Sequence, residues 1–167
     1  MTPRLAVPAD FPVVLALNEG SVHFLSPLTP ERLARLHEEA ALHLVIELAG
    51  EVVAFLLAFR EGANYDSVNY QWFSRRYASF LYIDRVVVSP NARGSGAGAL
   101  LYRRAFAHAA KSDVPWITCE FDVDPPNPAS EAFHQKFGFR ELGRQLVADG
   151  KKLVSLQGAA VSSAMCK

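Results

Sequence analysis

The stretch Arg93-Gly94-Ser95-Gly96-Ala97-Gly98 lies between a strand-like apolar run, Phe80 to Val88, and a helix-like run, Ala99 to Lys111. Three glycines within five residues let the backbone approach a ligand without obstruction by side chains. The helix that follows begins with free N–H groups and with the positive end of its dipole. A strand, a glycine loop and a helix start in this order predict an anion site for a phosphate or a pyrophosphate.

Hydrophobic periodicity on both sides of this stretch predicts further strands and helices. Strands are expected at 3–7, 42–48, 52–59, 80–88, 115–123, 139–147 and 151–157, and helices at 11–18, 29–40, 99–111 and 128–137. Asp10 and Asn127 are expected to cap the first and the last helix. The mixture of elements, with hairpins near both ends, predicts a single α/β domain at 1–157 and a frayed tail at 158–167.

Composition and charge exclude several classes of protein. The chain has 167 residues, 50% of them hydrophobic, and a formal net charge of zero, so no nucleic-acid or membrane partner is predicted. Two cysteines are too few for a disulfide framework, and the five histidines are scattered, so no metal site is expected. The N-terminus lacks a signal-peptide pattern and no apolar run approaches about 20 residues, which favours a soluble cytoplasmic protein.

Spacing separates the kinds of glycine loop that bind phosphate groups. A Walker-type loop ends in Gly-Lys-Ser/Thr, because the lysine reaches the phosphates and the hydroxyl holds magnesium. Here Ala99 and Leu100 follow Gly98, which excludes that loop. A dinucleotide fold needs Gly-x-Gly-x-x-Gly in its first strand–helix unit. The Gly-x-Gly-x-Gly spacing in the middle of this chain therefore disfavours a dinucleotide-binding oxidoreductase.

The segment from Arg93 to Gly98 matches a third kind of glycine loop better than these two. The sequence resembles the GNAT superfamily of acyl-CoA-dependent N-acyltransferases, whose signature Arg/Gln-x-x-Gly-x-Gly/Ala is matched at every fixed place by Arg93 to Gly98. The lead-in from Ile83 to Pro90 and the segment from Asn127 to Phe139 also look like the family. The resemblance covers Phe80 to Phe139. It implies an α/β fold with a central mixed, largely antiparallel twisted sheet of about six to seven strands and about four helices.

The resemblance implies acetyl-CoA as the cofactor. In this family the N–H groups of the loop hold the CoA pyrophosphate, which carries over to Arg93, Gly94, Ser95, Gly96, Ala97, Gly98 and Ala99. The main chain of Val86, Val87 and Val88 would pair with the pantetheine arm like an added strand, and an N–H there would polarise the thioester carbonyl. Asn127 matches an asparagine that touches the pantetheine arm, and Arg93 is equally suited to brace the loop.

The chemistry needs a proton acceptor for the amine and a proton donor for the thiolate. Many family members carry a tyrosine as the acid seven residues after the asparagine, and here that position is His134. A histidine can exchange protons near neutral pH, although a histidine on a core-facing helix is often structural. The candidate bases are Asp84, Glu120 and Asp122, each of which suits a salt-bridged strand residue equally well. A base acting through ordered water is a further alternative.

The acceptor side is predicted from two segments, 18–27 and 64–77, that contact the acceptor in the family. The second is predicted to be a long aromatic loop, and such loops are often functional. The candidate residues are Asn18, His23, Phe24, Tyr70, Trp72, Phe73 and Arg75. The aromatic rings would form an apolar wall and Arg75 would hold a carboxylate. The alternative is that the aromatics pack on their own domain or on a second subunit.

The implied function is acetyl-CoA-dependent transfer of an acetyl group to a primary amine of a small molecule or peptide. Direct attack in a ternary complex is expected, because Cys119 lies in an apolar run and is expected to be buried and inert. The alternative is a CoA-binding or sensing module with little catalysis, which the missing tyrosine favours. The resemblance also implies that a homodimer is a common assembly.

Overall fold

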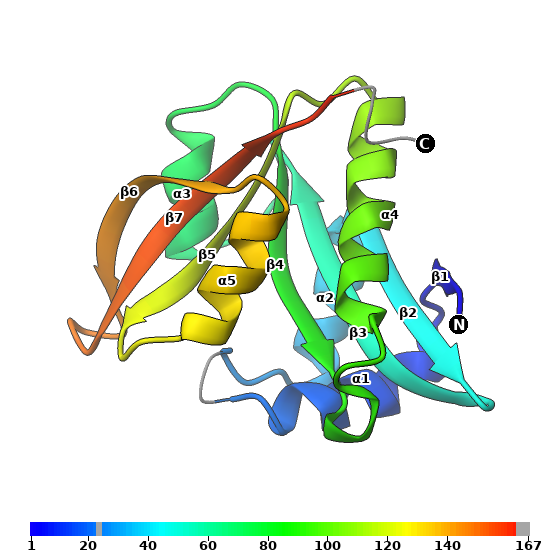
Figure 1. Ribbon diagram of the computed structural model, residues 1–167. Coiled ribbons are helices and arrows are strands. Elements are labelled where there is room, and N and C mark those ends of the chain that lie inside the picture. Colours follow the sequence, from blue (N-terminus) through cyan, green and yellow to red (C-terminus); the bar gives the residue numbers. More distant parts are fainter. Residues whose placement is uncertain (23–24, 163–167) are drawn as a thin grey trace.

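The computed structural model describes residues 1–22 and 25–162, which form one seven-stranded sheet (Figure 1). From edge to edge the strands are β1 (Pro3–Leu5), β2 (Leu42–Leu48), β3 (Glu51–Arg60), β4 (Leu81–Val88), β5 (Trp116–Asp124), β7 (Lys152–Ala160) and β6 (Arg140–Val147). β4 and β5 pair in parallel, and the other neighbouring strands pair antiparallel. The predicted mixed, largely antiparallel sheet is therefore confirmed.

Helices cover both faces of the sheet. They are α1 (Phe11–Glu19), α2 (Pro30–Glu39), α3 (Val68–Ser74), α4 (Ala97–Lys111) and α5 (Pro128–Lys136). In Figure 1, α4 and α5 lie together on one side of the sheet, and α2 and α3 lie behind it. The described part of the chain thus contains one α-helix more than the four that were predicted.

The nearly continuous apolar run of β3 is explained by burial on both of its faces. Leu56 packs into the core cluster under α4, whereas Leu57 packs into the cluster that contains α3 residues. Phe55, on the same face as Leu57, packs with Val14 of α1. Because side chains alternate along a strand, each layer of helices takes every second residue.

The segment at 61–77 is a correction to the sequence prediction. It contains α3, and the Ser67 hydroxyl caps this helix by accepting a hydrogen bond from the Tyr70 N–H at 3.3 Å. Tyr70 and Phe73 lie three residues apart on one helix face and are 1% and 0% exposed. The spacing of these aromatics was therefore a helix signal, and their burial favours the alternative in which they pack on their own domain.

A predicted cap and several predicted boundaries also differ from the structure. The Asp10 side chain makes no cap bond to α1; instead its carboxylate accepts from the Val7 N–H and from both Arg4 amino groups. α4 begins at Ala97 rather than Ala99. β7 continues through 158–160, so these residues are part of the sheet and not of a frayed tail. His23, Phe24 and Cys166 lie outside the described residues.

Candidate active site

A cavity opens where β4 and β5 diverge. Their parallel pairing is confined to Leu81 with Ile117 and Tyr82 with Thr118, while β4 stays paired with β3 as far as Val88. The two strands separate visibly beyond this point (Figure 1). A cavity of about 1110 Å³ lies in the gap and is lined by the glycine loop, both strands and α5. The residues that were predicted separately as cofactor and catalytic groups therefore share one cavity.

The glycine loop forms one end of this cavity. Gly94 and Gly96 have φ angles of 78° and 87°, in the left-handed region where a Cβ is disfavoured, so glycine is required there for its backbone. Gly96 precedes the first turn of α4, whose N–H groups lie beside the cavity. Among the predicted loop residues, Ser95 does not line the cavity; its hydroxyl accepts from the Ala97 N–H at 3.3 Å.

Val86, Val87 and Val88 line the cavity from the β4 side. The Val87 side chain is 5% exposed and packs with the α1 and α2 side chains, whereas Val86 and Val88 pack toward the α4 side. Their side chains are thus committed to packing. What they offer a ligand is the main-chain edge of β4 that faces away from β3, as expected.

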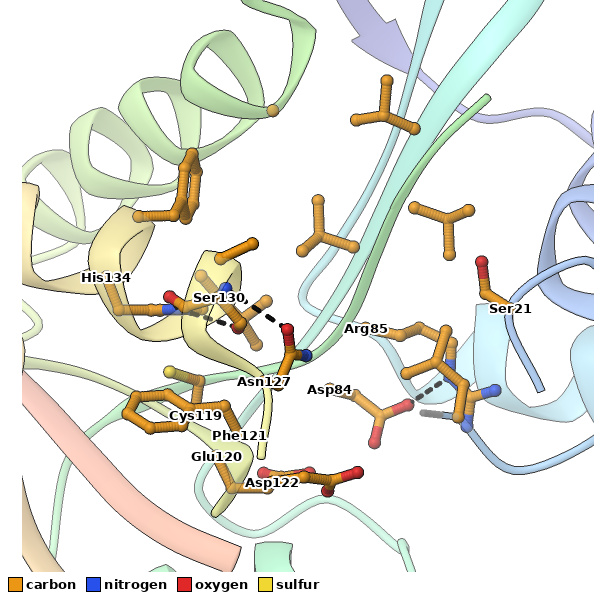
Figure 2. A pocket seen from close by; sticks show the side chains of 18 of the residues that line it. Ser21, Asp84, Arg85, Cys119, Glu120, Phe121, Asp122, Asn127, Ser130 and His134 are labelled. Atoms are coloured by element: carbon orange, nitrogen blue, oxygen red, sulfur yellow. Dashed lines mark hydrogen bonds and ion pairs between the residues drawn. The ribbon is translucent and has the colours of Figure 1, made fainter. Parts of the chain in front are cut away.

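Asn127 lies at the start of α5 and faces the same cavity (Figure 2). Its Oδ1 accepts from the Ser130 N–H at 3.3 Å, which confirms the predicted helix cap. The cap uses the carbonyl oxygen of the carboxamide, and the NH₂ group is the part with hydrogens to donate. The residue thus combines the cap with a position on the cavity wall.

His134 lies on α5 at the cavity wall and is 5% exposed (Figure 2). Its Nε2 lies 2.6 Å from the Tyr102 hydroxyl of α4, and its Nδ1 lies 2.6 Å from the Ser130 carbonyl oxygen. Burial lowers the pKa of His134, because the imidazolium loses hydration in this position. Tyr102 was not among the predicted site residues; its place one helical turn after Gly98 is the signal that it borders the loop.

Asp84 is tied into a buried network on the β4 side. Its Oδ1 accepts from the Tyr65 hydroxyl at 2.6 Å and its Oδ2 accepts from Arg85 Nε at 2.6 Å. Arg85 in turn donates to the Asn18 carboxamide oxygen at 2.9 Å and to the Ser26 carbonyl oxygen at 3.0 Å. The Asp84 and Arg85 side chains are 5% and 3% exposed. This ion pair therefore fastens the segment after α1 to β4, and Asn18 serves that network.

Glu120 stands across the cavity on β5, and its carboxylate lies toward those of Asp84 and Asp122 (Figure 2). Tyr82, which is fully buried, donates its hydroxyl to Glu120 Oε2 at 2.6 Å. Burial raises the pKa of Glu120 to about 8; the negative charge of Asp84 adds to the rise and the Tyr82 hydrogen bond opposes it. Glu120 therefore exchanges its proton in the range useful for acid–base chemistry.

Asp122 and Cys119 are the other titratable groups that β5 presents to the cavity. Asp122 is 8% exposed, its Oδ2 lies 3.5 Å from Lys152 Nζ, and burial raises its pKa against the opposing charge of that lysine. Cys119 is 2% exposed, as expected, and burial raises the pKa of its thiol well above the usual value. A thiol held neutral in this way is a poor nucleophile.

The predicted acceptor residues of 64–77 lie away from the cavity. Tyr70 and Phe73 are in the core, and Trp72 packs against Gly143 while the Arg76 guanidinium sits over its ring. None of the four predicted side chains lines the cavity, namely those of Tyr70, Trp72, Phe73 and Arg75. The part of this segment that does line it is Tyr65 together with Ser67, Val68 and Asn69 at the start of α3. The segment therefore reaches the cavity, but through other side chains than those predicted, because the prediction expected a loop where α3 forms.

Arg32 of α2 and Lys152 of β7 also line the cavity and were not predicted. Arg32 is paired with Asp66 and lies over the Tyr65 ring, with 5.6 Å between guanidinium carbon and ring centroid. Both residues reach the site from elements distant in sequence, so no local motif marked them.

Comparison with known proteins gives a consistent result. The model of the acetyltransferase (GNAT) family matches residues 13–139, which is more than half of the chain. The chain belongs to the GNAT acetyltransferase family. It is thus an acyltransferase of the class that uses acetyl-CoA, as the glycine loop and its cavity had indicated.

Individual relatives are more distant than the family model. A phosphinothricin N-acetyltransferase of Streptomyces coelicolor is 40% identical over 58 residues, which are 35% of this chain and 33% of that protein. The match therefore spans only about a third of that curated relative.

Solved structures share the fold over nearly the whole chain. The structure of Ard1 from Thermoplasma volcanium has a TM-score of 0.79 at 19% identity and covers 97% of this chain and 98% of its own. That of yncA from Salmonella typhimurium, solved with its cofactor acetyl-CoA, has a TM-score of 0.73 at 18% identity, with 98% and 95% covered. At these identities the likeness establishes the fold.

Two further features of residues 1–22 and 25–162 bear on the functional class. No helix in these ranges is both long enough and apolar enough to cross a membrane. Within the same ranges, no group of three or more His, Cys, Asp or Glu side chains is arranged to hold a metal ion.

Proposed function

We propose that this GNAT acetyltransferase transfers the acetyl group of acetyl-CoA directly to the primary amine of a small molecule or peptide. The observation that carries the proposal is that the glycine loop, which suits an anion, and Glu120 line one and the same cavity. The pKa of about 8 that burial gives Glu120 suits it to take a proton from an amine.

The cofactor is assigned to the side formed by the loop, β4 and α5. The N–H groups from Gly94 to Ala99 would hold the pyrophosphate at the positive end of α4. The main chain of 86–88 would pair with the pantetheine arm and would direct an N–H at the thioester carbonyl oxygen, where negative charge develops. Asn127 would donate its amide N–H to the same arm. Arg93, exposed at the loop entrance, would meet the phosphates.

Glu120 is the proposed base among the three carboxylates. Asp84 has both oxygens engaged, by Tyr65 and by Arg85, so taking a proton would break a buried ion pair. Asp122 faces Lys152, whose charge opposes protonation. The hydrogen-bond partners of Glu120, the Tyr82 hydroxyl and the Asn69 carboxamide, are neutral, and Glu120 lies in the cavity.

Direct attack is favoured over an acyl-enzyme. The Cys119 thiol is the one cysteine that the described residues bring to the cavity, and burial keeps it neutral. The acceptor would approach from the side lined by Tyr65, the start of α3, and Arg32.

We also expect a cytoplasmic enzyme and a homodimer. The dimer rests on family analogy alone, since the aromatics that suggested an exposed contact surface, Tyr70 and Phe73, are buried. Light scattering of the purified protein after size-exclusion chromatography measures the mass of the assembly and tests the dimer.

The test of the cofactor is the thermal shift with acetyl-CoA, CoA, NAD⁺ and ATP. A ligand that binds the folded state alone raises Tm by mass action. We expect a rise with acetyl-CoA and CoA only. A rise with NAD⁺ in place of CoA would contradict the proposal, and binding of CoA without turnover of any amine would favour the alternative of a sensing module.

A further inference from the structure

Both ring nitrogens of His134 are occupied by protein groups. Nδ1 lies 2.6 Å from the Ser130 carbonyl oxygen and Nε2 lies 2.6 Å from the Tyr102 hydroxyl. A carbonyl oxygen only accepts hydrogen bonds, so Nδ1 must carry a proton and donate it. His134 cannot deliver a proton directly to a ligand from either nitrogen without breaking one of these bonds.

The Tyr102 hydroxyl holds Nε2 of His134, and both residues line the cavity. Tyr102 lies one turn after Gly98 on α4, and both residues line the cavity. Its ring stands edge-to-face on Phe133 of α5, with 4.9 Å between centroids, and is 1% exposed. This packing and the hydrogen bond to His134 therefore hold the Tyr102 hydroxyl in one position in the cavity wall.

The surroundings keep this pair in a defined protonation state. Burial raises the pKa of Tyr102 well above its usual value, so the phenol stays protonated, and the titratable neighbours on β5 that act on it are Cys119 and Glu120. On α5, His134 meets the Ser130 carbonyl, and burial lowers its pKa. The phenol thus keeps its proton, and the imidazole is the member of the pair that takes up and releases a proton more readily.

We propose that Tyr102 donates the proton to the departing CoA thiolate and that His134 is the positioning residue that orients and reprotonates its hydroxyl. This inference rests on the direct acetyl transfer proposed above. It replaces the sequence-based expectation that His134 itself is the acid, because protein groups hold both of its ring nitrogens and the Tyr102 hydroxyl is one of them.

The transfer step takes one proton from the amine and delivers another to sulfur through the His134–Tyr102 pair. In the reactive form Nδ1–H of His134 donates to the Ser130 carbonyl, and Nε2–H donates to the Tyr102 oxygen, which leaves the Tyr102 O–H free for sulfur. The amine nitrogen bonds to the carbonyl carbon and loses its proton to Glu120. The C–S bond breaks with its electron pair on sulfur, the Tyr102 proton moves to sulfur, and the Nε2 proton moves to the Tyr102 oxygen. Glu120 then releases its proton to solvent water, and solvent returns a proton to Nε2, so that both groups are restored.

This transfer is favourable because a thiol has a pKa of about 8.5, above that of an imidazolium near 6.5, and burial lowers the latter further. The assistance matters most for a thiol that is a poor leaving group. A thioester of a far more acidic thiol needs no proton to depart, which provides a readout that a purely structural role of Tyr102 would not change.

The experiment compares single-turnover rates of wild type, Tyr102→Phe, His134→Gln and Tyr77→Phe. The acceptor is the amine that wild type acetylates fastest among α-amino acids, diamines and a short peptide. Phe preserves the ring packing of Tyr102, and Gln offers an oxygen to the Tyr102 hydroxyl and an N–H to Ser130 but relays no proton. Tyr77 lies outside the cavity and is the matched Tyr-to-Phe control.

With acetyl-CoA, we expect Tyr102→Phe and His134→Gln each to lower the single-turnover rate by about 10²-fold, at the lower end of what a general acid contributes. The Kd for acetyl-CoA should not change. With the S-acetyl derivative of 4-nitrothiophenol, Tyr102→Phe should match wild type. A wild-type rate for either variant with acetyl-CoA overturns the proposal, as does an equal loss for both thioesters. A wild type that acetylates no amine refutes direct transfer itself.

Discussion

Replacing Glu120 by Gln tests the proposed base through two properties that change in opposite directions. Gln keeps the shape of the side chain and can still accept from the Tyr82 hydroxyl, but it cannot ionise or take a proton. We expect kcat to fall by about 10²- to 10⁴-fold, the usual contribution of a general base. We also expect the folded protein to become more stable at neutral and alkaline pH.

The stability effect follows from the pKa of Glu120. The unfolded chain releases this proton near pH 4.5, and the folded protein holds it until about pH 8, chiefly because of burial. Between these values the folded state binds more protons, so its stability falls as pH rises. At 1.36 kcal/mol per pH unit, the difference amounts to about 3 kcal/mol at pH 7 and about 5 kcal/mol above pH 8. Gln carries no such penalty.

Urea unfolding from about pH 5 to about pH 9 measures this difference. The gain in unfolding free energy of Glu120→Gln over wild type should grow with pH and level off above the folded pKa. Glu38→Gln, which removes an exposed carboxylate of α2, is the matched control. An offset that stays constant with pH would show that Glu120 ionises normally in the folded state, and the argument for its role as the base would fail.

Three further substitutions test the loop, the α3 packing and the helix cap. Gly96→Ala puts a Cβ at a φ of 87°, so the free energy of unfolding in urea should fall by about 1–2 kcal/mol. The Kd for acetyl-CoA, measured by calorimetry, should rise. An unchanged Kd would exclude the loop from the cofactor site. Gly143→Ala puts a Cβ 2.6 Å from Trp72 Cζ2, which should lower the free energy of unfolding by about 1–3 kcal/mol and alter the Trp72 fluorescence. The KM for the acceptor should not change. A selective rise in that KM would show that Trp72 contacts the acceptor after all. Asn127→Ala removes the α5 cap and should cost about 0.5–2 kcal/mol and weaken acetyl-CoA binding, whereas a change in stability alone would limit Asn127 to the cap.

The glycine loop and the helix that follows it were predictable from sequence because their signals are local. Gly94 and Gly96 have the positive φ angles that only glycine adopts readily, and α4 follows them immediately. The buried face of α4, including Leu101 and Phe106, followed from periodicity alone. Each of these features depends on residues within a few positions of one another.

The acceptor side was not predictable in the same way, because its contacts join segments far apart in the chain. Arg85 stands in an apolar strand and its partners Asn18 and Ser26 lie about sixty residues earlier, so only the fold brings them together. The Tyr102–His134 pair likewise joins two helices. The helical spacing of Tyr70 and Phe73 was available as a local signal and was outweighed by the density of aromatic residues in the segment.

The measurement that tests the central claim most directly is the fate of the acetyl group. Acetyl-CoA carrying an isotopic label is mixed with the protein and each amine of the panel, and both the amine and the intact protein are weighed by mass spectrometry. Direct transfer predicts labelled N-acetyl amine in step with released CoA, with no acetylated protein at any time. Labelled protein that forms before product, or release of CoA that is independent of every amine, would contradict direct transfer.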